Sequence, residues 1–213
     1  MNIEPVQWQA APKNLFLKDG EVHVWLIHSF VENSLDQEEQ GRAAKFISLV
    51  HQERFIKAHS GLREILSKYT HQNPKSIIFD KTASGKPILK HFPNIHFNLS
   101  HSEDIALCAV SNNPVGIDVE YLNKNMDYLS IAKRFFNPVE YEFIKSQENF
   151  KLAFFKLWTQ KEAYLKSQGK GIAGGLEVEI PKEVAITHFV PAPHYLAAVG
   201  SGEQLIFFHS SGF

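Results

Sequence analysis

Alternating apolar and polar residues mark a series of short strands along the chain. In such a stretch successive side chains point to opposite faces, so one face can pack on a core. Clusters of Gly, Pro, Asn and Asp separate these stretches, as expected for turns between strands. The predicted strands cover residues 21–30, 77–79, 95–101, 105–111, 115–120, 176–180, 195–199 and 204–208.

Apolar residues spaced three and four apart predict helices between the strands. The longest such pattern, over residues 52–69, forms one apolar stripe with charged residues along its flanks. Ser34 and Gln37 have the spacing of a capping box and predict a short helix before residue 50. Asn137-Pro138 followed by Glu140 is a strong helix-start signature. Further helices are predicted over residues 129–136, 139–146 and about 150–168.

The order of these elements predicts an α+β fold built from two similar, closely packed halves. Strand, helices and strands occur before about residue 113 and again after it, although sequence identity between the halves is low. Gly85-Lys86-Pro87 and Gly169-Lys170-Gly171 hold comparable positions in them. Because no low-complexity linker intervenes, we expect residues 1–113 and 114–213 to pack on each other rather than form independent domains.

Charge and cysteine content narrow the classes of function and the compartment. The formal net charge is −1 over 213 residues, so the chain has no overall attraction for nucleic acid or anionic membranes. The single cysteine, Cys108, excludes an intramolecular disulfide and suits a reducing compartment. We expect a cytoplasmic protein, since no apolar segment has the length of a membrane span and residues 1–20 lack the features of an export signal.

The predicted strand over residues 115–120 carries two carboxylates among aliphatic residues. Asp118 and Glu120 share one face of this strand, and the aliphatic side chains fill the other. Two anions side by side in a half-buried place favour either a proton or a cation. A solvated strand end is the alternative interpretation of the same pattern.

A third carboxylate lies on the last long predicted helix. If Glu162 joins Asp118 and Glu120, the three carboxylates, with waters and a phosphate, suit octahedral Mg2+ better than Zn2+. Lys166 follows Glu162 by one helical turn on the same face. The alternative for these two residues is an exposed helical ion pair, which contributes only roughly 0.3 kcal/mol.

Polar residues also gather at two predicted turns. Lys86 lies in the tight turn Ser84-Gly85-Lys86-Pro87, and Ser100 and His101 lie at the tip of the hairpin formed by residues 95–111. A meander of this hairpin with the following strand would bring His101 near Asp118. An ordinary turn histidine is the alternative for His101.

Taken together, these motifs resemble the 4'-phosphopantetheinyl transferases, in particular the Sfp-type pseudodimeric branch. One D-x-E or K-E motif is a weak signal, but five motifs in the family's order and spacing are specific. They cover roughly residues 45–172. The matching motifs are Gly85-Lys86-Pro87, Phe97-Asn98-Leu99-Ser100-His101-Ser102, Val115-Gly116-Ile117-Asp118-Val119-Glu120, Lys133-Arg134-Phe135-Phe136, and residues 158–166 followed by Gly169-Lys170-Gly171.

The resemblance implies a fold, a reaction and partners. The fold is a pseudodimer with coenzyme A at the interface of its halves. The reaction transfers the phosphopantetheine arm of coenzyme A to a serine of an apo acyl, peptidyl or aryl carrier protein and releases adenosine 3',5'-bisphosphate. We therefore expect a monomeric enzyme that acts on coenzyme A and a carrier protein, with no nucleic-acid or membrane partner.

Roles for individual residues follow from the same resemblance. Asp118, Glu120 and Glu162 would hold Mg2+ on the pyrophosphate of coenzyme A, where the ion would neutralise charge on the leaving group. In the family the residue matching Glu162 is also proposed as the base for the carrier serine. Lys166 would reach the pyrophosphate as a point charge, and Lys161, its matching neighbour, would also bind coenzyme A in a less defined role.

At the nucleotide end the resemblance implies a second set of residues. Lys86, Ser100 and His101 would face the nucleotide, with His101 on the 3'-phosphate. In the helix before them the match loosens, because an arginine of many family members is absent at the corresponding position. Arg54 and Arg63 are the candidates that remain there for the 3'-phosphate.

Two other functions stay open for the same residues. Three carboxylates and a lysine could position a water for phosphoryl attack in a Mg2+-dependent phosphoesterase or nuclease. A non-catalytic coenzyme A-binding module could keep the fold without turnover. For an acidic carrier protein, a basic surface beside the cleft would be needed. The residues available for that surface are Lys124, Lys133, Arg134 and Lys151.

Overall fold

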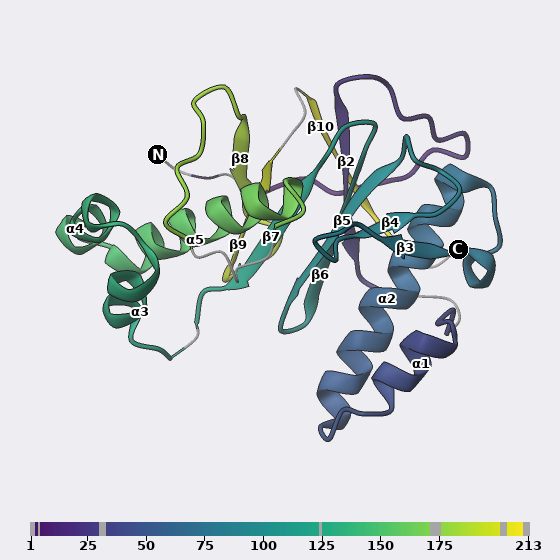
Figure 1. The fold of residues 1–213 in the computed structure, drawn as a ribbon, viewed down its shortest axis with the longest axis horizontal. Coiled ribbons are helices and arrows are strands. Elements are labelled where there is room, and N and C mark those ends of the chain that lie inside the picture. Colours follow the sequence, from purple (N-terminus) through teal and green to yellow (C-terminus); the bar gives the residue numbers. More distant parts are fainter. Residues whose placement is uncertain are drawn as a thin grey trace.

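The computed structural model describes residues 3, 5–29, 33–123, 125–170, 176–200 and 204–210 and has the predicted α+β architecture. A five-stranded sheet and a three-stranded sheet pack face to face, and a long helix covers the outer face of each (Figure 1). Gly171 of the sequence motifs and Lys124 of the candidate basic surface lie outside the described residues.

The five-stranded sheet draws its strands from both ends of the chain. Strand β6 (Ile105–Ser111) lies between β2 (Glu21–Ile27) and β5 (His96–Ser102) and is antiparallel to both. On the other side of β2, β10 (Gln204–His209) pairs in parallel and is followed by the short β1 (Gln9–Ala10). The C-terminal strand therefore lies in the sheet of the N-terminal half.

Helix α2 (Leu49–Thr70) covers one face of this sheet. Its buried Leu62 and Ile65 pack with Trp25 and Ile27 of β2 in one hydrophobic cluster. Shorter elements flank the helix. They are α1 (Gln37–Ala43), the 3-10 helix η1 (Pro74–Ser76), and the hairpin of β3 (Phe79–Lys81) and β4 (Pro87–Leu89).

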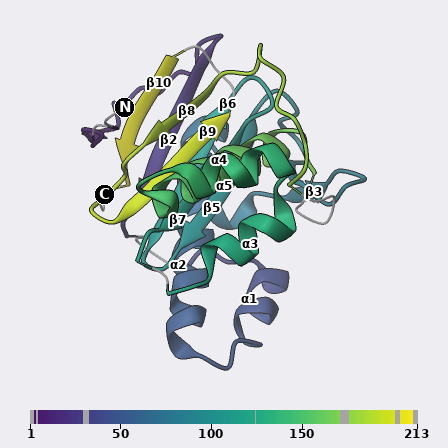
Figure 2. The same cartoon turned by 90° about the vertical axis from the view of Figure 1, so that its left-hand side faces the viewer.

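The second half contains an antiparallel three-stranded sheet and three helices. Helix α5 contacts all three strands of this sheet, and α3 and α4 pack beside α5. Figure 2 shows these three helices on the side that faces the viewer. The strands, in sheet order, are β7 (Gly116–Tyr121), β9 (Tyr195–Gly200) and β8 (Ile186–Phe189), and the helices are α3 (Tyr128–Phe135), α4 (Pro138–Ser146) and α5 (Phe150–Ser167).

The two halves repeat one topology. The sheet order of the first half is β2–β6–β5. Its first strand in the chain, β2, pairs with its last, β6, and β6 also pairs with the middle one, β5. The order β7–β9–β8 follows the same rule. In each half the long helix precedes the middle strand. The predicted arrangement of two similar, closely packed halves is thus confirmed, while the exact division at residue 113 stays a prediction.

The inner faces of the sheets form a shared apolar layer. Val22 and Val24 of β2 lie in one cluster with Ile117, Val119 and Val199 of the second sheet. The aliphatic face of the acidic strand is therefore buried between the sheets, as predicted. The opposite face of β7, with its carboxylates, is turned toward α5.

A glycine lets α5 lie directly on β7. A Cβ atom at Gly116 would stand 2.0 Å from the carbonyl oxygen of Ala163 and 2.4 Å from the backbone nitrogen of Ser167. No side chain fits in that space, so Gly116 sets the distance between the strand and the helix. The carboxylates of β7 and the side chains of α5 consequently share one narrow region.

Two predicted features of strand pairing and position are wrong. The predicted meander fails because both edges of β6 already carry β2 and β5, so β7 pairs with β9 in another sheet. Residues 176–180 are not a strand. Lys161 instead holds the carbonyls of Leu176 and Val178, and the strand of this region is β8, ten residues later.

Helix boundaries mostly agree with the pattern. Asn137 and Glu140 form the predicted capping box at the start of α4. The capping box of α1 is formed by Asp36 and Glu39 rather than by Ser34 and Gln37. The carboxylate of Asp36 accepts from the backbone of Glu39, and the carboxylate of Glu39 accepts from the backbone of Asp36. Among the described residues, no helix is both long and apolar enough to cross a membrane.

Candidate active site

Strand β7 places Asp118 and Glu120 on its α5-facing side. Asp118 is only 5% exposed, and Glu120 is half-buried. Burial and the nearby negative charge of Glu120 raise the pKa of Asp118, although the ammonium of Lys166 opposes this shift. The two carboxylates therefore lie in a place where a positive charge would be strongly stabilised.

Side chains of β5 replace a missing strand partner along the edge of β7. Three alternate residues of β5 accept hydrogen bonds from three alternate backbone N–H groups of β7. The pairs are Asn98 with Ile117 at 2.8 Å, Ser100 with Val119 at 3.3 Å, and Ser102 with Tyr121 at 3.1 Å. This ladder joins the two halves of the molecule at the site.

Two serines of this ladder also orient the carboxylates. The hydroxyl of Ser100 donates to Asp118 Oδ1 at 3.0 Å, and that of Ser102 donates to Glu120 Oε2 at 3.0 Å. Ser102 was not among the predicted site residues. Its signal was present, because Asn98, Ser100 and Ser102 alternate along one face of a strand.

Helix α5 supplies the cation of the site. Lys166 Nζ lies 2.6 Å from Asp118 Oδ1 and 3.2 Å from Ser100 Oγ. Burial acts to lower the pKa of Lys166, but the charges of Asp118, Glu162 and Glu120 outweigh it and raise the pKa. Lys166 thus remains an ammonium ion among three carboxylates.

Glu162 lies one helical turn before Lys166 and is 4% exposed. Burial, followed by the charges of Asp118 and Glu120, raises the pKa of Glu162 to about 7, against the effect of Lys166. The predicted third carboxylate therefore shares one electrostatic environment with the other two.

The carboxylates fit a hard cation in their chemistry, but they are not gathered into a complete ligand set. In the described part of the chain, no three His, Cys, Asp or Glu side chains meet closely enough to bind a metal. Asp118 Oδ2, however, is buried without a hydrogen-bond partner. An orphaned carboxylate oxygen beside two further carboxylates matches the all-oxygen coordination that Mg2+ prefers.

His101 and Arg54 lie in a groove that leads to Glu120. This groove has a volume of about 270 Å³ and is also lined by His51 and Phe46. Loss of solvation and the nearby charges of His59, Lys166 and Arg54 lower the pKa of His101. The two residues predicted to bind an anion are therefore adjacent. Arg54 already forms ion pairs with Glu103 and Asp104 at 2.8 and 2.9 Å.

Comparison with known proteins identifies the family of proteins to which this chain belongs. Residues 114–193 match the family model described as the 4'-phosphopantetheinyl transferase superfamily, and residues 26–113 match the 4'-phosphopantetheinyl transferase N-terminal model. The 4'-phosphopantetheinyl transferase HetI of Nostoc sp. is 40% identical over 95% of this chain and 98% of its own length. The chain belongs to the 4'-phosphopantetheinyl transferase superfamily.

Two further relatives of this transferase, both from bacteria, are also 4'-phosphopantetheinyl transferases. The 4'-phosphopantetheinyl transferase Sfp of Bacillus subtilis is 32% identical over 68% of this chain and 70% of its own. A 4'-phosphopantetheinyl transferase of Bacillus pumilus is 40% identical over 65% of this chain and 60% of its own. The chain is thus an enzyme of the transferase type.

Lys86 of the transferase does not face an open groove. Its ammonium donates to the carbonyl oxygens of Val115 at 2.9 Å, Lys166 at 2.7 Å and Ser167 at 3.3 Å. Burial lowers the pKa of Lys86 to about 8. An ammonium has three N–H donors, and these three carbonyls occupy all of them. In this structure Lys86 therefore has no donor left for the predicted contact with coenzyme A.

Lys161 of the transferase points away from the carboxylates. It is buried, forms an ion pair with Glu140 at 2.6 Å, and donates to the carbonyls of Leu176 and Val178. These contacts connect α5 to α4 and to the chain segment that follows α5. The structure therefore gives Lys161 a structural role, while its predicted role in binding coenzyme A stays a prediction.

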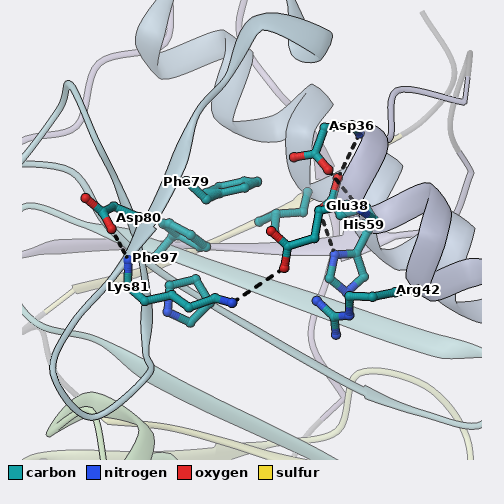
Figure 3. A pocket seen from close by; sticks show the side chains of 11 residues that line it. Asp36, Glu38, Arg42, His59, Phe79, Asp80, Lys81 and Phe97 are labelled. Carbon is teal, nitrogen blue, oxygen red and sulfur yellow. Dashed lines mark hydrogen bonds and ion pairs between the residues drawn. The ribbon is translucent and has the colours of Figure 1, made fainter.

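Arg63 is likewise a structural residue. It is 0% exposed and forms ion pairs with Asp36 and with Glu39. Its guanidinium also donates to the carbonyls of Pro74 and Ile77. Figure 3 shows the neighbouring pocket, with Asp36 and His59 in its wall. With its donors committed inside the N-terminal half, Arg63 does not support the predicted contact with a 3'-phosphate.

Proposed function

We propose that this transferase moves the 4'-phosphopantetheine arm of coenzyme A to a serine of an apo acyl, peptidyl or aryl carrier protein. Adenosine 3',5'-bisphosphate would be the released product. The observation that carries the proposal is the similarity to HetI over nearly the whole of both chains. The group of Asp118, Glu162 and Lys166 supports it, because a pyrophosphate leaving group needs positive charge, which the ammonium can supply directly and the carboxylates can supply by holding a cation.

Magnesium belongs to the same proposal. We infer that Asp118, Glu120 and Glu162 would hold the ion, with the unpartnered Asp118 Oδ2 as the clearest ligand atom. When bound, Mg2+ would supply positive charge to the pyrophosphate and so stabilise the leaving group. Ser100 and Ser102 keep two of the carboxylates in place by donating hydrogen bonds to them.

The protein's own residues supply the remaining chemistry. Lys166 is charged and half-buried, so it can bind the pyrophosphate as a point charge. Glu162, with a pKa of about 7, can hold or release a proton near neutral pH. Because a carboxylate that binds a cation is a weaker base, we assign Glu162 to the metal first, and its second role as base for the serine stays a prediction.

The proposal also assigns residues to the 3'-phosphate of coenzyme A and to the surface that would bind the carrier protein. We infer that His101, beside Arg54 in the groove next to Glu120, binds the 3'-phosphate of coenzyme A. For an acidic carrier protein, Lys133 and Arg134 on the exposed side of α3 provide positive charge. The monomeric state and the cytoplasmic location stay predictions.

The test is incubation of the protein with coenzyme A, Mg2+ and a panel of apo carrier proteins, followed by mass spectrometry. The proposal predicts that at least one carrier gains the mass of one phosphopantetheinyl group. A carrier whose acceptor serine is replaced by alanine should stay unmodified. If every apo carrier stays unmodified while coenzyme A is hydrolysed, the phosphoesterase alternative replaces the transferase proposal.

A further inference from the structure

One ammonium ion joins the two elements that carry the reactive groups. Lys86 Nζ contacts the carbonyl of Val115, directly before β7, and the carbonyls of Lys166 and Ser167, at the end of α5. Strand β7 carries Asp118 three residues after Val115. Helix α5 carries Lys166. The ammonium of Lys166 forms an ion pair with Asp118, and its backbone carbonyl is one of those that Lys86 contacts.

The end of α5 is well suited to such a contact. The last carbonyls of a helix lack intrahelical partners and carry partial negative charge, so a cation there is stabilising. The backbone N–H of Gly169 shares the carbonyl of Lys166 at 3.2 Å, and the N–H of Lys170 returns to Leu165 at 2.8 Å. The residues that follow α5 thus satisfy its terminal carbonyls only in part, and Lys86 supplies further hydrogen bonds to them.

The backbone that carries Lys86 is itself held in a fixed turn. Thr82 N–H donates to the carbonyl of Lys86 at 2.9 Å, and Lys86 N–H donates to Thr82 Oγ1 at 3.0 Å. Between them Gly85 adopts a φ of 85°, a left-handed conformation that favours glycine. The ammonium is therefore presented from a rigid hairpin and not from a mobile loop.

A second glycine lets this hairpin rest on the helix end. Gly169 has a φ of 68°, and a Cβ atom there would lie 3.2 Å from Ser84 Oγ and 3.6 Å from Lys86 Cβ. The hairpin and the turn after α5 are thus packed against each other. The contact joins the N-terminal half to the helix that carries Glu162.

From this geometry we propose that Lys86 is a positioning residue, which fixes the end of α5 against β7 and so places Lys166 and Glu162 opposite Asp118. The carbonyl of Lys166 is held by Lys86, while its ammonium is held by Asp118. Loss of the Lys86 ammonium frees the last turn of α5 to shift. A shift of about 1 Å at reacting groups can lower turnover by about 100-fold. The catalytic part of this inference rests on the proposed transfer reaction.

The first test separates positioning from substrate binding. Lys86→Met removes the ammonium and keeps a similar chain length, Lys86→Arg keeps donors for the carbonyls, and Lys90→Met removes an exposed lysine just after the same hairpin. In the carrier assay we expect K86M to lower kcat at least about tenfold with little change in KM for coenzyme A. K86R should recover most of kcat, and K90M should match the parent. A raised KM for coenzyme A with unchanged kcat in K86M would overturn the inference.

The second test does not depend on activity. Amide hydrogen exchange should be faster in K86M than in the parent for the last turn of α5 and the residues up to Lys170, and unchanged in K90M. Equal exchange in K86M and the parent would overturn the inference even if turnover fell. If the parent transfers nothing to any carrier, the proposed function fails, while faster exchange in K86M would still establish the positioning contact. Circular dichroism of each variant confirms that the compared proteins are folded.

Discussion

The ammonium of Lys166 lies 2.6 Å from Oδ1 of Asp118, while the other oxygen of the same carboxylate has no hydrogen-bond partner. One side of Asp118 is thus neutralised by the protein, and the other has no partner in the protein. Since an unpaired buried carboxylate oxygen costs free energy, this arrangement supports the proposed role of Asp118 as a metal ligand.

Glu162→Gln should abolish transfer and leave the fold intact. The change removes a negative charge from a group of three carboxylates, two of them buried, so like-charge repulsion falls while the side-chain shape is kept. We expect turnover to fall at least about 100-fold with a Tm no lower than that of the parent. The measurements are carrier modification rates and thermal unfolding.

The control for this variant is Glu142→Gln, which removes an exposed carboxylate paired with Lys145 on α4. It should keep full turnover. Full turnover of E162Q with a parent-like Tm would remove Glu162 from the site.

Ser102→Ala should weaken metal binding without changing the ligands themselves. Ser102 both accepts from the backbone of Tyr121 and donates to Glu120, so its loss leaves that carboxylate less well oriented. Loss of such an outer contact typically costs about 10-fold or more in metal affinity. Isothermal titration of Mg2+ into the metal-free protein measures the effect.

Ser146→Ala is the matched control, because that exposed serine of α4 donates to the carbonyl of Phe143 and accepts from Gln147, and neither hydrogen bond involves a site carboxylate. Its Mg2+ affinity should equal that of the parent. An unchanged affinity in S102A would show that the orientation of Glu120 does not matter for metal binding.

Arg63→Met should destabilise the fold and leave coenzyme A recognition unchanged. The variant leaves the buried carboxylate of Glu39 and the carboxylate of Asp36 without their main cation. Removing one partner of a buried ion pair typically costs about 3–5 kcal/mol of unfolding free energy. Urea unfolding measures this loss. A parent-like stability together with a higher KM for coenzyme A would restore the interpretation of Arg63 as a phosphate ligand.

The contribution of His23 to stability should decline as the pH falls below about 6.5, the ordinary pKa of histidine. Burial lowers the pKa of His23 in the folded protein, against the effect of Glu21. The unfolded chain therefore binds the proton at a higher pH than the folded one. The stabilising contribution is complete above about 6.5 and is lost as the pH decreases toward the lower folded pKa.

His23→Gln should flatten this decline, although it lowers stability at all pH values by breaking the contacts with Tyr69 and Glu21. The control is His91→Gln, at an exposed position. Unfolding midpoints at several pH values between about 5 and 8 give the slope. The same slope in H23Q and the parent would contradict this assignment.

Local chemistry made much of the site predictable. The alternation of Asp118 and Glu120 with aliphatic residues is a property of any strand, so their common face followed from sequence. Glu162 and Lys166 are four residues apart on a helix, so their common face followed too. The capping box of Asn137 was equally local.

Long-range contacts decided what the sequence could not show. The meander failed because β6 pairs with β2, a strand more than 70 residues earlier, and has no free edge for β7. Lys86, Lys161 and Arg63 lie in or near motif positions, yet their long side chains end on backbone carbonyls or buried carboxylates. Residue spacing places the Cα atom of a lysine or arginine but not the end of its flexible side chain.

The most direct measurement compares nucleotide release with carrier modification in one reaction. The protein is mixed with coenzyme A, Mg2+ and an apo carrier that it modifies, and both products are quantified over time. Transfer predicts one adenosine 3',5'-bisphosphate released for each phosphopantetheinylated serine, and neither product from Asp118→Asn. Release of the nucleotide without modification of the carrier, or undiminished transfer by D118N, would contradict the proposed reaction at this site.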